Sequence, residues 1–184
     1  MSTVLVPLAE GCEELEAVTV IDLLRRAGIT VVAASLDAQI VSANRGVRLV
    51  ADTSLSDVIY DDFDMIVLPG GLPGSSNLDK DSHIHAILKR LHQSGNAIAA
   101  ICAAPLVLAH CGLLEGKRAT CYPGVLLQED WPNIRLSNDP VVIDGTILTS
   151  RGPGTAMEFA LAIIEYLTDT QTRNQVEAGL VRPF

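Results

Sequence analysis

The sequence alternates short apolar segments with longer segments of helical periodicity, and this alternation restricts the fold more than any other feature. Strands are predicted where small and β-branched apolar residues run together, at 3–8, 30–35, 64–69 and 97–101. Helices are predicted at 13–27, 82–93, 103–110 and 154–167, and from a weaker pattern at 170–180. Strands that are apolar throughout are typical of a parallel sheet with helices on both faces. The sequence therefore predicts an α/β fold with a mostly parallel sheet.

The remaining segments are predicted to be irregular, with a few short β segments. Residues 39–60 contain candidates at 40–41 and 47–50, and another short strand is predicted at 119–121. The segment VVIDGTILT predicts a β-hairpin with Asp144-Gly145 at its turn. No linker, low-complexity tract or repeat interrupts the pattern, so residues 1–184 are interpreted as a single domain.

Functional residues of parallel sheets gather at the carboxyl ends of the strands, where the chain turns into loops and helices. In this sequence the rule selects four places, which follow Leu8, Leu68, Ile101 and Thr149. Catalytic and binding residues are expected there.

Charge and composition exclude several classes of protein. A net charge of −9 and a pI near 4.7 argue against binding to nucleic acid or to an anionic membrane surface. No apolar run approaches the roughly 20 residues of a membrane span, and the N-terminal segment lacks the basic start of a signal peptide. A cytoplasmic location is the resulting expectation.

The four cysteines do not form a disulfide framework or a zinc site. No CxxC pair occurs, and no histidine or cysteine cluster has zinc-ligand spacing, so neither a metal nor another cofactor is expected. Most of the four are expected to be buried, inert hydrophobic residues, Cys111 and Cys121 above all.

Cys102 differs because it stands directly between an apolar strand and an apolar helix. Thiolates are favoured at helix N-termini, where unpaired backbone N–H groups and the helix dipole stabilise negative charge. Ala103 and Ala104 allow a sharp turn, and Pro105 suits a first helical turn. The arrangement resembles the nucleophile turn of α/β hydrolases, with sulfur in place of oxygen. The alternative is a cysteine that only fills space below the sheet edge.

No histidine is placed to serve Cys102. His83, His85 and His92 lie in or beside a polar helix and are expected to be solvated, and His110 lies two turns along the helix that follows Cys102. No histidine follows residue 110, which excludes the Cys-His-Glu triad of glutamine amidotransferases.

A carboxylate near the start of the chain is the candidate partner. Glu13, Glu14 and Glu16 follow the first predicted strand, and the helix dipole accounts for the first two. Glu16 lies on a helix that is apolar almost all round, so its carboxyl is expected to be desolvated, with a raised pKa. Beside Cys102 the two groups would titrate as a coupled pair, with Glu16 holding a proton and donating it to sulfur.

Glycine-rich turns follow two other strands. Gly70 and Gly71 allow bare backbone N–H groups to approach the sulfur and to form an oxyanion hole with the N–H groups beside Cys102. The turn lacks the residues of a P-loop and the spacing of a dinucleotide-binding fingerprint. In the later turn SRGPGT, Arg151 either binds an anion or forms a plain salt bridge.

Four motifs in order resemble the ThiJ/PfpI superfamily over essentially the whole chain: EGCEELEAV, VLPGG, AAICAAP and LTSRGPGTAMEFA. Within it, the chain is similar to the branch of the Parkinson-disease protein deglycase and bacterial YajL. The resemblance implies a flavodoxin-like three-layer sandwich and a homodimer. It also implies a redox-sensitive nucleophile at Cys102, a protonated Glu16, and backbone amides of Gly71 and Ala103 that point at the pocket.

By the same resemblance, Arg45 and Arg151 would lie near an anion site by the dimer interface. The activities implied are conversion of 2-oxoaldehydes to hydroxy acids, deglycation of proteins, and redox-regulated chaperoning. The leading hypothesis is therefore a cofactor-independent cysteine enzyme that acts on 2-oxoaldehydes or glycated proteins and protects against carbonyl and oxidative stress. The alternative is a redox-sensing chaperone or regulatory protein whose output is oxidation of Cys102.

The sequence departs from the resemblance before Pro123. Many relatives carry a histidine there, whereas this chain has Tyr122, so proton transfer would depend on Glu16, Tyr122 or water. This departure tilts slightly toward the sensor hypothesis. Protease activity is not expected, because the protease branches place a histidine directly after the cysteine and this chain has Ala103.

Two further expectations concern the first helix. Its outer residues leave more apolar surface than one sheet face covers, which supports a homodimer independently; they are Leu15, Val18, Ile21, Asp22 and Arg25. Cys12 either faces Cys102 as a resolving thiol, lies toward the dimer partner, or is inert.

Overall fold

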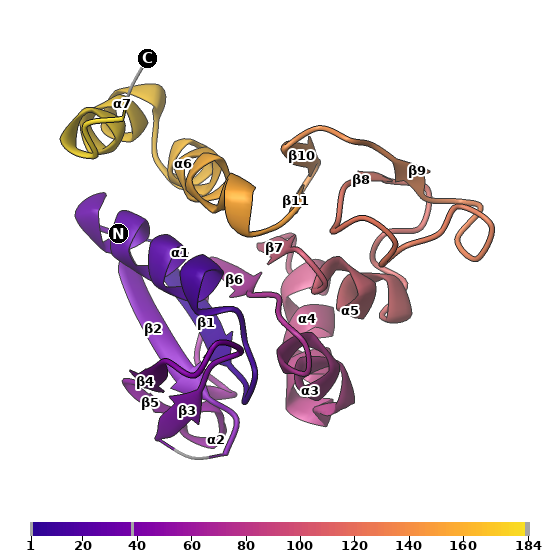
Figure 1. The fold of residues 1–184 in the computed structure, drawn as a ribbon, viewed down its shortest axis with the longest axis horizontal. Coiled ribbons are helices and arrows are strands. Elements are labelled where there is room, and N and C mark those ends of the chain that lie inside the picture. Colours follow the sequence, from indigo (N-terminus) through magenta and orange to yellow (C-terminus); the bar gives the residue numbers. More distant parts are fainter. Residues whose placement is uncertain (1, 38, 183–184) are drawn as a thin grey trace.

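The computed structural model describes residues 2–37 and 39–182 and contains a central seven-stranded sheet (Figure 1). The strand order is β10-β11-β7-β6-β1-β2-β5. All neighbours run parallel except β10 and β11. The bounds are β1 (Thr3–Leu8), β2 (Thr30–Ser35), β5 (Thr53–Ser54), β6 (Met65–Leu68), β7 (Ala97–Ile101), β10 (Val141–Asp144) and β11 (Ile147–Ser150). The predicted parallel sheet and the hairpin that turns at Asp144-Gly145 are confirmed.

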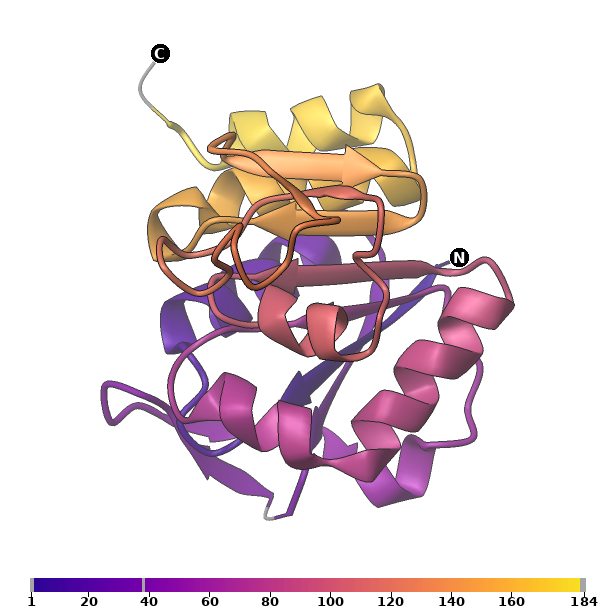
Figure 2. The ribbon, with the colours of Figure 1, turned by 90° about the vertical axis from the view of Figure 1, so that its right-hand side faces the viewer.

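Helices cover both faces of this sheet. One face is covered by α1 (Glu14–Arg26) and α6 (Ala156–Leu167), which pack side by side, with α7 (Thr170–Gly179) against α6. The other face is covered by α2 (Leu55–Val58), α3 (Gly74–Lys80), α4 (Ser82–Gln93) and α5 (Pro105–His110). Figure 2, seen from that second side, shows α3, α4 and α5 in front of the strands. The flavodoxin-like three-layer arrangement predicted from the sequence is confirmed.

The reason for the layers is visible in the burial of the strands. Successive side chains of a strand point to opposite faces. In β1, Val4 and Val6 enter the core under α1 and α6, whereas Leu5 enters the core under α4 and α5. Every residue of β6 and β7 is buried. The two aliphatic cores stabilise both sides of the sheet.

Several elements differ from the prediction. The helix α3 was missed, because its sequence GSSNLDK has no apolar periodicity. Outside the central sheet, β3 (Ile40–Ser42) pairs with β4 (Arg48–Val50), and β8 (Arg118–Ala119) pairs with β9 (Arg135–Leu136), which was not predicted. A short 3₁₀ turn, η1 (Pro153–Thr155), precedes α6 where a continuous helix was predicted.

The topology brings the four selected strand ends together. Since β1, β6, β7 and β11 are parallel neighbours, the loops that follow them open at the same edge of the sheet. Backbone hydrogen bonds tie two of these loops together, because Glu13 N–H donates to Gly70 O at 2.9 Å and Gly74 N–H donates to Gly11 O at 3.1 Å. Within the described residues, no helix has the length and apolar character to cross a membrane.

Candidate active site

Cys102 occupies a sharp turn between β7 and α5. Its φ of 64° is a left-handed conformation that non-glycine residues rarely adopt, and such conformations concentrate at functional sites. Hydrogen bonds hold the turn: Cys102 N–H donates to Ser150 O at 3.0 Å, and Tyr122 N–H donates to Cys102 O at 2.8 Å. The helix α5 begins only at Pro105, so the predicted start at residue 103 was two residues early. The residue is buried, with 8% exposed.

Glu16 lies in the first turn of α1 and is fully buried. Gly70 N–H donates to its Oε2 at 2.8 Å. Burial raises the pKa of Glu16 to about 7, and the hydrogen bonds of the carboxyl to Gly70 and to the Cys102 thiol limit the rise. The structure therefore gives Glu16 the raised pKa expected from its place on an apolar helix.

The thiol of Cys102 does not have the low pKa expected from its position. Burial and the negative charge of Glu16 raise the pKa of Cys102 to about 12, although the N–H groups of Gly71 and Ala103 lower it. The helix that follows has only six residues, so its dipole is weak. The thiol and the carboxyl titrate as a pair, and a thiolate forms near neutral pH only when Glu16 holds the proton.

The two glycines after β6 have different roles. A side chain at Gly70 would place Cβ 2.5 Å from Cys102 Cβ and 2.8 Å from Glu16 Oε2, so only glycine fits between thiol and carboxyl. Its N–H is already bonded to Glu16, which corrects the prediction that it belongs to an oxyanion hole. The amides of Gly71 and Ala103 lie at the sulfur as predicted, and Gly71 has φ 90°.

Tyr122 and Gly152 border Cys102 on the outer side of the site. A Cβ built on Gly152 would lie 3.2 Å from Tyr122 Cδ2 and 3.9 Å from Cys102 Sγ, so the ring and the sulfur both border Gly152. Tyr122 is half exposed, and Pro123 is exposed beside it. The role of Gly152 was not recognised from the sequence, although the turn that contains it was.

Arg45 and Arg151, the two arginines predicted near an anion site, form hydrogen bonds with groups outside the pair of Cys102 and Glu16. Arg45 is exposed, and its backbone N–H donates to the Glu14 carboxylate at 2.9 Å. Arg151 donates from Nη1 to Asn138 Oδ1 at 2.7 Å, and among the described residues it forms no salt bridge, so that alternative is not found there. Among the hydrogen bonds of the described residues, neither arginine contacts Cys102 or Glu16.

Cys12 is fully buried, and burial raises its pKa to about 12. A thiol enclosed within its own chain is not placed at a surface toward a partner. The high pKa also makes Cys12 a poor resolving thiol.

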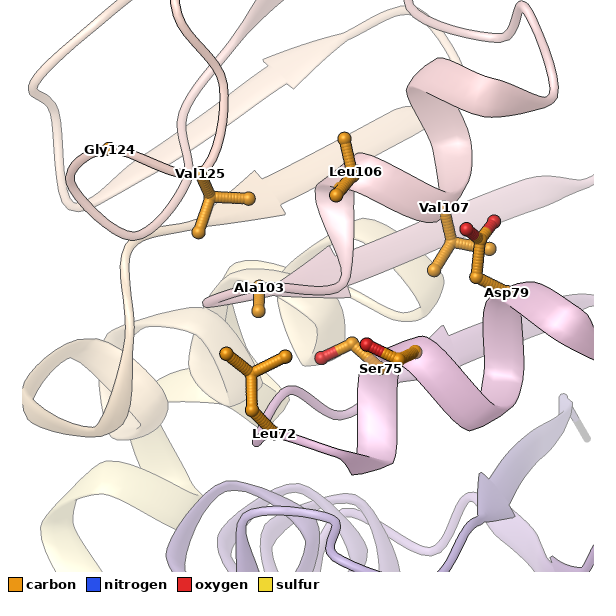
Figure 3. A pocket seen from close by; sticks show the side chains of 9 residues that line it. Leu72, Ser75, Asp79, Ala103, Leu106, Val107, Gly124 and Val125 are labelled. Carbon is orange, nitrogen blue, oxygen red and sulfur yellow. The ribbon is translucent and has the colours of Figure 1, made fainter.

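A mostly apolar cavity of about 300 Å³ adjoins the amide of Ala103 (Figure 3). It lies between α3 and α5, and the sequence did not predict it because α3 itself was missed. In the close-up, the side chains of Leu72, Ala103 and Val125 converge at one end, and Asp79 and Val107 stand at the other. The remaining lining residues are Ser75, Ser76, Leu106 and Gly124.

Comparison with known proteins identifies a matching family. A family model described as the DJ-1/PfpI family matches residues 2–166. The chain is 45% identical over 180 residues to Protein DJ-1 homolog B of Arabidopsis thaliana, covering 97% of this chain but 41% of that protein. It therefore spans less than half the length of that relative.

Two further relatives match over most of both chains. The Glutathione-independent glyoxalase DJR-1.2 of Caenorhabditis elegans is 39% identical over 167 residues, covering 91% of this chain and 89% of that protein. The solved structure of oxidized Toxoplasma gondii DJ-1 superposes with a TM-score of 0.93 at 40% identity and covers all of both chains.

Proposed function

This chain belongs to the DJ-1/PfpI family, and from that membership we propose that it is a cofactor-independent cysteine enzyme acting on 2-oxoaldehydes or early glycation adducts. In this proposal it works in the cytoplasm and protects against carbonyl and oxidative stress. The observation that carries the proposal is the enclosed pair of Cys102 and Glu16, with the amides of Gly71 and Ala103 at the sulfur. The glyoxalase name of the nematode relative supports the same substrate class.

The first step forms a carbon–sulfur bond. The Cys102 thiol adds to the aldehyde carbon while its proton passes to the Glu16 carboxylate. The N–H groups of Gly71 and Ala103 stabilise the oxyanion that develops on the aldehyde oxygen. That oxyanion then takes the proton from Glu16, which gives a hemithioacetal and restores the Glu16 carboxylate.

The second step moves a proton between neighbouring carbons. Glu16 removes the proton from the former aldehyde carbon and returns it to the adjacent carbonyl carbon. The hydroxyl proton passes to the neighbouring oxygen, so the hemithioacetal becomes a 2-hydroxy thioester. Water then hydrolyses the thioester and releases the 2-hydroxy acid and the thiol. A carboxyl with a pKa of about 7 suits both halves of this transfer, because it accepts and returns protons near neutral pH.

The alternative function is a redox-sensing chaperone or regulatory protein. Tyr122 favours it, since no histidine assists proton transfer at that position. The amides that stabilise an oxyanion also suit the oxygens of a sulfenic or sulfinic acid on Cys102. The oxidized state of the Toxoplasma relative supports this chemistry.

Formation of lactate from methylglyoxal separates the two functions. For the enzyme we expect Cys102→Ser to lower the rate by about 10³-fold or more, and the matched Cys111→Ser variant to retain it within about twofold. Lactate formation that does not depend on Cys102 would sink the enzyme proposal. A peroxide-induced sulfinate at Cys102 without lactate formation would instead support the sensor.

We also propose that the chain forms a homodimer through α1 and the β3–β4 hairpin. Leu15 and Val18 on α1 and Val47 and Val50 at the hairpin are large apolar side chains that remain about half exposed or more. Apolar surface gathered on adjoining elements is typical of an interface. Light scattering at micromolar concentration tests this, and a monomeric mass contradicts it.

A further inference from the structure

A second thiol has a histidine beside it. Cys111 follows α5 directly and is half buried, and its Sγ lies 3.3 Å from His85 Nδ1 on α4. The sequence predicted an inert, buried Cys111 and a solvated His85; Cys111 is only half buried, and His85 is partly exposed but contacts the sulfur. The two residues are 26 positions apart and meet because α4 and α5 cover the same face of the sheet, with α3 packed against both.

The other contact of the imidazole determines the tautomer of His85, and so whether the nitrogen that faces the sulfur is a base. His85 Nε2 lies 2.6 Å from the backbone carbonyl oxygen of Asp79. A carbonyl oxygen only accepts hydrogen bonds, so Nε2 carries the hydrogen of the neutral ring. The lone pair is then on Nδ1 and points at Cys111, whose thiol donates to it.

Asp79 positions this histidine. Its Oδ1 is buried, lies 3.5 Å from His85 Nε2 and has no hydrogen-bond partner among the described residues. Its Oδ2 lies 2.7 Å from His110 Nδ1, and the His110 ring packs on Trp131 with centroids 5.7 Å apart. The carboxylate is thus held from a second side and is placed to stabilise positive charge on His85.

The sulfur also borders a cavity of about 410 Å³. Its lining includes His85, Lys89, His92 and Gln93 from α4, and Cys111 and Gly112 after α5. The charged or titratable side chains of this lining are basic or thiol groups. Outside the lining, Asp79 from α3 lies beside His85, and His110 from α5 contacts Asp79. The cavity therefore favours an anionic ligand.

We propose that Cys111 is a second modification site, where the thiol exchanges with small disulfides that carry carboxylate groups. His85 acts as the base and Asp79 as a positioning residue. This site is separate from Cys102 and does not depend on the function proposed for that residue.

The exchange balances without another reactant. As Cys111 Sγ attacks one sulfur of the disulfide, its proton passes to His85 Nδ1, a new S–S bond forms and the original S–S bond breaks. The leaving thiolate takes the proton from His85 and departs as a thiol. Cys111 is oxidised, and the released sulfur is reduced. Burial and the charge of Asp79 raise the pKa of Cys111, so the thiol keeps its proton until the base removes it.

The test treats the whole protein with glutathione disulfide, which carries carboxylates, or with cystamine, a cationic disulfide. Peptide mass mapping then gives the rate of mixed-disulfide formation at each cysteine. With glutathione disulfide, we expect Cys111 to react about tenfold faster than the buried Cys121, which has no base beside it. Equal rates at the two cysteines contradict the proposal.

Two variants separate base from charge. His85→Gln keeps a hydrogen-bonding group and should slow Cys111 about tenfold with both disulfides. Lys89→Gln should slow the reaction with glutathione disulfide about threefold and leave or raise the rate with cystamine. An unchanged rate in His85→Gln overturns the base, and equal effects of Lys89→Gln on both disulfides overturn the preference for anions.

A third variant keeps the test decisive if His85→Gln fails to fold. Asp79→Asn should move the half-maximal rate of Cys111 to lower pH, because the charge of Asp79 raises the pKa of the Cys111 thiol. A purely structural role for Asp79 leaves that pH profile in place and contradicts the positioning role. An unchanged reaction rate of Cys102 shows in each variant that the fold is intact.

Discussion

Two thiols lie nine positions apart at opposite ends of α5, and their surroundings differ in almost every respect. Cys102 precedes the helix at the carboxyl edge of the sheet, is nearly fully buried, and has the enclosed carboxyl of Glu16 as its partner. Cys111 follows the helix, is half buried, and has the His85 imidazole as its partner. Two thiols of one short segment thus have different bases, a carboxyl from α1 and an imidazole from α4.

Burial explains which base serves which thiol. Burial raises the pKa of Glu16 to about 7, into the range where a base accepts and returns protons in neutral solution. The more open site uses the imidazole of His85, whose Nδ1 lies 3.3 Å from Cys111 Sγ. A carboxyl becomes a neutral-pH base only in an enclosed site, whereas histidine serves at the surface.

The largest expected difference between the two sites is in lactate formation when each base is replaced by glutamine. Glu16→Gln should lower lactate formation about 10²-fold to 10⁴-fold, because the amide cannot carry a proton between the two carbons. His85→Gln should leave lactate formation within about twofold, because its contacts lie at Cys111. Methylglyoxal turnover by both variants measures this difference, and equal losses would mean that the two sites are not independent.

The pH dependence of folding stability tests the burial of Glu16. The Glu16 pKa is about 7 in the folded chain against 4.5 for the free group, so the folded state holds the proton more tightly. This stabilisation is fully present below pH 4.5 and is lost as pH rises to about 7. The expected loss is at most about 3 kcal/mol.

Urea unfolding of wild type and Glu16→Gln at pH 5 and pH 8 measures this term. The wild type should lose more stability between the two pH values than the variant does, while the other titrating groups affect both proteins alike. A loss of equal size in the two proteins contradicts a raised pKa at Glu16.

The glycines beside the thiols give the smallest expected difference. Gly70→Ala places Cβ 2.5 Å from Cys102 Cβ and 2.9 Å from Ile101 O, so overpacking should cost about 1–3 kcal/mol and lower lactate formation. Gly112→Ala meets no atom within 4 Å and bears only the strain of φ 72°, about 1–2 kcal/mol. Denaturation midpoints and turnover test this, and normal turnover in Gly70→Ala contradicts the close contact of thiol and carboxyl.

Much of the first site was predictable because its signals are local. Cys102 stands between an apolar strand and an apolar helix, and Glu16 lies on a helix that is apolar almost all round, so strand end and burial both followed from the sequence. The direction of the Gly70 amide and the Asn138 partner of Arg151 did not follow, because each depends on how loops distant in sequence meet.

The second site gave no local signal. The sequence pattern predicts three unrelated segments here: the end of one helix with Cys111, a polar helix with His85, and an irregular turn with Asp79. The three side chains come together only because α3 packs against both α4 and α5 on the same face of the sheet.

The sequence by itself determined the α/β fold and the strand-to-helix turn that carries Cys102, because apolar periodicity and the turn residues act over a few neighbouring positions. The tertiary structure alone decided the proton acceptor of each thiol. A pKa and a hydrogen bond depend on desolvation and on distances of a few ångströms between side chains, and these arise only when helices distant in sequence pack on one sheet.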